Sequence, residues 1–212
     1  MSPRLLLADE FFLTAHDDVT GKPRTAGRAI GLGLAGALLA ELLLVERITT
    51  QDGLVVVVNR RPPNDALAHT VLDQLSSERQ RHNLRTWLSY LAQTATERVG
   101  TRLERAGWVS RVASRRLLRT KVRWVPTDMT AAATPGALLR LQLQREHPLD
   151  VLEIVLAGLV DAAGLNQIVL WGVTTRTFQY RDWCLSSLSA PLREVLAETK
   201  AAVGNAVLTH RA

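Results

Sequence analysis

The sequence GLGLAG at residues 31–36 has the glycine spacing of a dinucleotide-binding loop. Such a loop needs glycines because a phosphate approaches the backbone where a helix begins after a strand. Here residues 25–29 are not an apolar strand, and no alternation of strands and helices follows. We therefore interpret these small residues as a place of close helix packing. A nucleotide-dependent enzyme is the weakest of the hypotheses.

Other side chains that could do chemistry are scattered along the chain. The five histidines lack the short spacing of a zinc-binding helix, and Cys184 has no second cysteine with which to bind a metal. Asp17 and Asp18 are more typical of a turn than of a cation site. Neither a Gly-x-Ser-x-Gly sequence nor a Walker loop is present. We expect no catalytic set, no metal and no cofactor, and hence a protein that is not an enzyme.

A basic segment between Glu104 and Asp128 is the strongest positive signal. It holds seven of the 26 bases and no acid, which leaves 19 bases against 20 acids elsewhere, so the net charge of +6 belongs to this segment. Trp108 and Trp124 bracket its centre, and tryptophan suits a membrane interface because its ring is apolar and its N–H polar. The segment indicates an anionic partner. Its bases are Arg105, Arg111, Arg115, Arg116, Arg119, Lys121 and Arg123.

Hydrophobic periodicity predicts a mainly α fold, a single compact multi-helix domain over residues 1–212 with two short β-hairpins. Asp52-Gly53 is a two-residue hairpin signal, and residues 108–125 form the second hairpin. Between them, apolar residues from Leu84 to Leu103 share one face and predict one long helix. The apolar stretch 29–45 contains Glu41 and three glycines, so we expect no transmembrane helix. Because Cys184 is the single cysteine, no internal disulfide is possible, and we expect a reducing, cytoplasmic location.

Several stretches resemble the Golgi phosphoprotein 3 family in their order and spacing. They are residues 6–13 (LLADEFFL), 17–23 (DDVTGKP), 33–42 (GLAGALLAEL), 86–91 (TWLSYL), 98–99 (RV) and 103–109 (LERAGWV). The resemblance covers roughly residues 4–165. It implies a mainly helical domain that binds phosphatidylinositol 4-phosphate on Golgi membranes and sorts membrane enzymes there. It also implies that the hairpin at residues 108–125 takes part in self-association.

This sequence departs from the family at the lipid pocket. The tryptophan and arginine that the family uses correspond to Ala26 and Ala35, and a second pair of arginines corresponds to Gln93 and Thr96. The headgroup site is therefore not carried over. The nearby bases that we expect to serve instead are Lys22, Arg24 and Arg28.

Together these patterns predict a peripheral protein on the inner face of a membrane that binds anionic, phosphoinositide-like headgroups. Self-association through residues 108–125 is a further expectation. The alternative is a winged-helix-like protein that binds nucleic acid, because a helix, Gly107 and a basic two-stranded wing occur in this order. The residues expected to contact the membrane are Lys22, Arg24, Arg28, Trp108, Arg111, Arg115, Arg116, Arg119, Lys121, Arg123 and Trp124.

Overall fold

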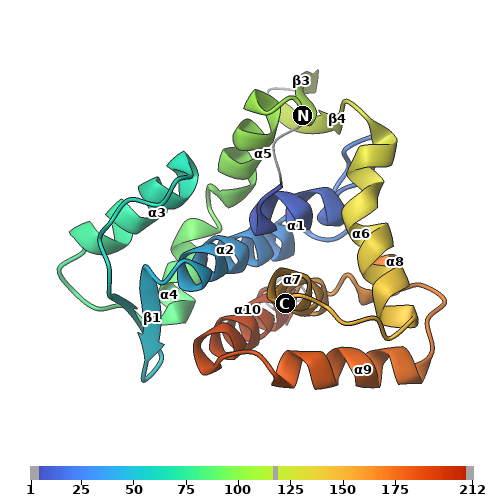
Figure 1. The fold of residues 1–212 in the computed structure, drawn as a ribbon. Helices are drawn as coiled ribbons and strands as arrows, with labels where there is room; N and C mark the ends of the chain where they lie inside the picture. Colours follow the sequence, from blue (N-terminus) through green and yellow to red (C-terminus); the bar gives the residue numbers. More distant parts are fainter. Residues whose placement is uncertain (1–4, 117–118, 209–212) are drawn as a thin grey trace.

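The computed structural model describes residues 5–116 and 119–208, and the side chains of residues 114–121, 207 and 208 lie outside this description. Within it, ten helices and two antiparallel hairpins form the mainly α fold that the periodicity predicts (Figure 1). The helices are α1 (Leu7–Ala15), α2 (Gly27–Leu44), α3 (Ala66–Ser77), α4 (Leu84–Leu91), α5 (Ala95–Arg105), α6 (Met129–Gln144), α7 (Val151–Ala162), α8 (Asn166–Val169), α9 (Thr175–Ser186) and α10 (Ala190–Leu208). The strands are β1 (Ile48–Gln51), β2 (Leu54–Val57), β3 (Val109–Arg116) and β4 (Arg119–Pro126).

Helix α2 is the core of the fold. Every residue from Ala29 to Leu42 is buried, and α2 packs against α1, α4, α5, α7 and α10 (Figure 1). By length and composition α2 is apolar enough to cross a membrane, and 78% of it is buried inside the structure. Apolar residues on all sides are what a helix enclosed by other helices requires.

The glycines of the GLGLAG motif lie in the middle of α2, where other elements approach its backbone. A β-carbon at Gly31 would lie 2.7 Å from the Ala92 carbonyl oxygen, and one at Gly36 would lie 2.6 Å from Thr199 Oγ1. At Gly33 a side chain would collide with the ring of Phe11. The interpretation of this motif as close helix packing is therefore confirmed.

The first hairpin forms where the sequence predicts it. Asp52 and Gly53 both have positive φ (52° and 75°), as a tight two-residue hairpin turn requires. The strands pair in register from Ile48 opposite Val57 to Gln51 opposite Leu54.

The single helix expected between Leu84 and Leu103 is instead two helices, α4 and α5. The amides of Gln93 and Thr94 donate to the carbonyls of Tyr90 and Leu91, three residues back, which tightens the chain into a turn. Both helices still bury the predicted apolar stripe, so periodicity identified the buried face but not the break. The buried residues are Leu84, Trp87, Leu88, Leu91, Ala95, Val99 and Leu103.

A buried ionic cluster joins four helices. Arg102 of α5 contacts Asp9 of α1 (2.8 Å), Glu41 of α2 (3.3 Å) and Asp65 (2.9 Å). Asp65 also caps α3 by accepting from the Ala68 amide at 2.8 Å. On its own, burial lowers the Arg102 pKa, but the carboxylates of Glu41, Asp9 and Asp65 outweigh burial and raise it. This cluster holds α1, α2, α3 and α5 together around one cation.

Candidate functional site

A polar turn after α1 fixes Arg24 against the end of that helix. Asp17 Oδ1 accepts hydrogen bonds from the Thr20 hydroxyl (2.7 Å) and amide (2.8 Å), and these bonds lower the Asp17 pKa. Arg24 donates from Nε to the His16 carbonyl (2.8 Å) and from Nη2 to Asp18 (2.7 Å). The turn therefore fixes the direction in which this guanidinium points.

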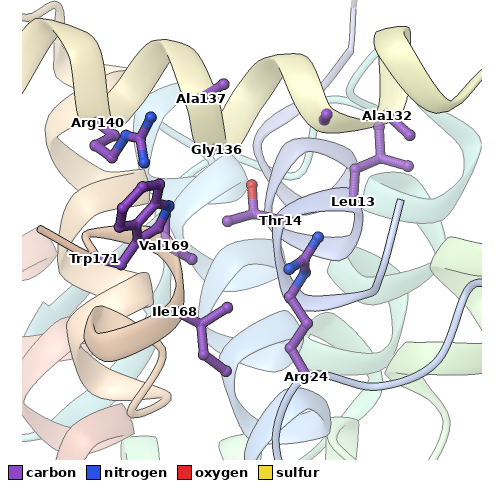
Figure 2. A pocket seen from close by; sticks show the side chains of 11 residues that line it. Leu13, Thr14, Arg24, Ala132, Gly136, Ala137, Arg140, Ile168, Val169 and Trp171 are labelled. Carbon is purple, nitrogen blue, oxygen red and sulfur yellow. The ribbon is translucent and has the colours of Figure 1, made fainter. Parts of the chain in front are cut away.

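A cavity of about 180 Å³ opens beside the turn, between α1, α6 and α8. Arg24 and Arg140 lie on opposite sides of it, with Thr14 between them (Figure 2). The α6 wall is built from small residues, which leave room between the two guanidiniums. These are Ala132, Ala133, Gly136 and Ala137. We call this hollow the Arg24–Arg140 cavity.

The charge of this cavity comes mainly from Arg140. Its Cζ lies 4.7 Å from the centroid of the Trp171 indole, a cation–π contact that orients the guanidinium. Among the described residues no carboxylate pairs with Arg140, whereas Arg24 is paired with Asp18. The cavity therefore keeps a positive charge that an anion can neutralise through charge-assisted hydrogen bonds.

Exposed apolar side chains lie in and near the lining of the cavity. Trp171 is 65% exposed and Ile168 39% exposed, and both line the cavity beside α8 (Figure 2). Met129, 62% exposed, lies on the cavity side of α6 because it precedes Ala133 by four residues. Val19, 59% exposed, belongs to the turn that holds Arg24. The site thus combines a positive cavity with an apolar rim.

The three bases expected near the start of α2 do not converge on one site. Arg24 lines the Arg24–Arg140 cavity, and Lys22 is exposed on the same turn. Arg28 instead lines a separate hollow between α2, α4 and α10, together with Arg85. Of the three, Arg24 alone enters the cavity with Arg140.

The four positions that we expect to correspond to the lipid pocket of the resembled family hold no base in this chain. Ala35 is fully buried within α2, while Ala26 is exposed just before that helix. Gln93 is exposed in the turn between α4 and α5, and Thr96 is half-buried. The Arg24–Arg140 cavity is lined by none of these four residues.

The second hairpin packs on α5 through Trp124. This residue is 5% exposed, and its indole lies against Gly100, where a β-carbon would be 2.6 Å from Nε1. We therefore reassign Trp124 from the expected interfacial role to a packing role. Trp108 is half-buried against the core. Arg111 stays exposed, with Cζ 5.9 Å from the Trp124 ring centroid.

The remaining bases of the hairpin differ in how far the structure describes them. Arg123 is half-exposed on the strand face opposite Trp124, and faces Val112, which is 48% exposed. The open end of the hairpin, where its strands join the rest of the fold, adjoins the Arg24 turn. There Gly21 (φ 63°) packs directly against the Trp124 carbonyl. The side chains of four expected membrane-binding bases lie outside the described part: Arg115, Arg116, Arg119 and Lys121.

Two of the scattered side chains that could do chemistry, His16 and Cys184, are buried in the fold. His16 Nδ1 lies 2.7 Å from the Phe12 carbonyl oxygen, its ring stacks on Phe12, and burial lowers its pKa. Burial raises the pKa of the Cys184 thiol, which is the opposite of what a nucleophile needs. In the described ranges no three His, Cys, Asp or Glu side chains gather as a metal site would require.

Sequence reasoning missed Arg140 and Trp171. They are 31 positions apart and neither belongs to a charge run or a motif. Their contact arises because α8 and the loop after it pack against α6. Only the tertiary fold brings them together with Arg24.

A family model described as Golgi phosphoprotein 3 (GPP34) matches residues 7–207. The match extends well beyond residues 4–165, where the resemblance is apparent by inspection, and includes the C-terminal helices. It gives no support to the nucleic-acid alternative. No curated protein compared with the chain matches it.

Proposed function

The chain belongs to the Golgi phosphoprotein 3 family, and we propose that it is a non-enzymatic peripheral membrane protein that binds anionic phospholipid. The Arg24–Arg140 cavity carries this proposal, because two guanidiniums converge there beside an exposed indole. A guanidinium is well suited to a lipid phosphate since its planar fork matches two phosphate oxygens. Trp171 would lie among the headgroups, with its ring in the apolar boundary. The surface involved would be the inner, cytoplasmic face of a membrane.

The cavity favours a general anionic headgroup over one particular phosphoinositide. One of its two arginines, Arg24, is already paired with Asp18 at 2.7 Å, which leaves the charge of Arg140 for the ligand. Selection of a highly phosphorylated headgroup would need several uncompensated bases around one cavity. We therefore assign the site to the phosphate that anionic lipids share.

The basic hairpin supplies a second contact in this proposal. The open end of this hairpin adjoins the turn that holds Arg24, so the hairpin and the Arg24–Arg140 cavity can approach the same membrane surface. Arg111 and Arg123 are accessible on this hairpin. Each base near an anionic bilayer contributes about 1 kcal/mol, which corresponds to about fivefold in partitioning. Self-association through this hairpin is compatible with such a role, because two copies would double the number of bases at the membrane.

Flotation with vesicles of phosphatidylcholine and phosphatidylserine tests the proposal. The parent should float with these vesicles and not with pure phosphatidylcholine. Arg140→Gln should reduce partitioning about fivefold, since one uncompensated base is lost. Arg24→Gln/Arg140→Gln should reduce it further.

The matched control is Arg145→Gln, which removes an exposed arginine just after α6, away from the cavity. Equal binding by Arg140→Gln and Arg145→Gln would contradict the assignment of the cavity. Equal binding of the parent to charged and uncharged vesicles would contradict the proposed function as a whole.

A further inference from the structure

A second basic hollow, of about 210 Å³, lies between β2 and the loop that joins α3 to α4. Three arginines line it: Arg60 from the segment after β2, and Arg79 and Arg81 from the loop. In Figure 1, α3 and β1 lie on the left of the molecule and α6 and α8 on the right. This hollow is therefore separate from the Arg24–Arg140 cavity, and the two have no lining residue in common.

The loop that carries two of these arginines is held by the first hairpin. The Val55 amide donates to the His82 carbonyl at 3.2 Å, and the Leu84 amide donates to the Gly53 carbonyl at 3.0 Å. His82 also packs edge-on against Trp87, which is 7% exposed. The backbone between α3 and α4 is thus anchored at its C-terminal end, which keeps the arginines near β2.

The charges around the hollow are not balanced. Glu78 is the one carboxylate among its lining residues, and it accepts from the Gln80 amide at 3.3 Å and faces His82 at 3.9 Å. In the described part of the chain, neither Arg60, Arg79 nor Arg81 takes part in a salt bridge. Like charges gathered around one hollow repel each other, and a bound anion relieves that repulsion.

We propose that this hollow binds a phosphoryl group, as free phosphate or as the exposed monoester of a small molecule or lipid headgroup. Guanidinium groups present N–H donors in pairs that match phosphoryl oxygens. Ser76 and Gln80 also line the hollow, and a hydroxyl and a side-chain amide are neutral donors that a phosphoryl oxygen can accept from. A doubly charged monoester suits three arginines better than a singly charged diester does. This site is independent of the proposed membrane function, because it uses other residues.

Calorimetric titration with inorganic phosphate at constant ionic strength tests the site. The parent should bind phosphate saturably. Arg79→Gln/Arg81→Gln should bind phosphate at this hollow more weakly by a factor of about ten or more, since two charged donors are lost. The control is Arg145→Gln/Arg193→Gln, which removes the same charge from exposed positions elsewhere. All four arginines are exposed, so the melting temperatures should agree and show that both variants fold.

A second experiment distinguishes the source of the phosphoryl group. Vesicles of phosphatidylcholine with phosphatidic acid present the same monoester on a surface. Weaker binding of the Arg79/Arg81 variant to both phosphate and these vesicles supports a lipid ligand. Weaker binding to phosphate alone supports a soluble ligand. If the parent binds no phosphate, or the variant matches its control in both experiments, the site is refuted, and the outcome for the Arg24–Arg140 cavity is unaffected.

Discussion

Replacing Arg102 by methionine would remove the cation that three carboxylates share. Methionine keeps much of the side-chain volume but loses the contacts to Asp9 (2.8 Å), Glu41 (3.3 Å) and Asp65 (2.9 Å). Breaking a buried ion pair from one side leaves uncompensated charge and costs about 3–5 kcal/mol. A domain of this size loses about 2–4 °C of melting temperature per kcal/mol. We therefore expect the melting temperature to fall by about 6–20 °C.

The loss should also depend on pH. Burial raises the pKa of Asp9 and of Glu41, and Arg102 opposes that rise. A raised carboxyl pKa means that the folded chain binds more protons than the unfolded chain. The free energy of unfolding then falls as pH rises from the carboxyl pKa of the unfolded chain, about 4, through the higher pKa of the folded chain. Without Arg102 both pKa values rise further, so the stability lost by the variant should be larger at pH 7 than at pH 5.

Urea unfolding followed by circular dichroism at both pH values measures this difference. Arg105→Met is the matched control, because Arg105 is an exposed arginine three residues further along α5. The reasoning is refuted if Arg102→Met loses less than about 1 kcal/mol relative to that control. It is equally refuted if the loss is the same at pH 5 and pH 7.

Three further predictions follow from the hairpin and the lipid site. Gly100→Ala should destabilise the fold by about 1–3 kcal/mol, because its β-carbon would meet the Trp124 ring, and urea unfolding measures the loss. Replacing Arg119, Lys121 and Arg123 by serine should weaken binding to anionic vesicles by about 3 kcal/mol in flotation, with little change in melting temperature because surface charges contribute little to folding. Binding measured across several anionic lipids should show no strong preference for one phosphoinositide, and should weaken steeply with salt because screening acts over about 8 Å at physiological salt.

Each of these predictions has its own control. Gly204→Ala lies in α10 with nothing within 4 Å of the new β-carbon, and it should be neutral or slightly stabilising. An equal loss from both glycine substitutions would contradict the packing of Trp124 on Gly100. A serine triple mutant that floats like the parent would contradict a membrane role for the hairpin. One phosphoinositide bound far more tightly than other anionic lipids would contradict a general headgroup site.

Local patterns in the sequence predicted the elements well where the causes are local. The Asp52-Gly53 turn, which predicts a two-residue hairpin, produced the first hairpin. The glycines of residues 31–36 were correctly interpreted as packing residues, because no strand precedes them. The break between α4 and α5 was missed, since the apolar stripe continues through it and the periodicity gives no sign of a turn.

The candidate site was harder to predict because it depends on contacts between distant residues. Arg24 was named from its closeness to α2 in the sequence, but its partner Arg140 and the neighbouring Trp171 come from α6 and the loop after α8. Burial of Trp124 was also not visible, because a tryptophan at the edge of a basic segment suits a core as well as a membrane interface. Its partner Gly100 lies on another element and leaves a space that no local pattern reveals.

Quenching of tryptophan fluorescence by brominated lipid tests most directly whether the face around the Arg24–Arg140 cavity meets the membrane. Trp171 and Trp183 are exposed to nearly the same extent, 65% and 68%, but Trp171 lies in the loop after α8 and Trp183 in α9. On vesicles of phosphatidylserine and brominated phosphatidylcholine, quenching should persist in Trp183→Leu and largely disappear in Trp171→Leu. Quenching that survives in Trp171→Leu, or that disappears in Trp183→Leu, would contradict the account.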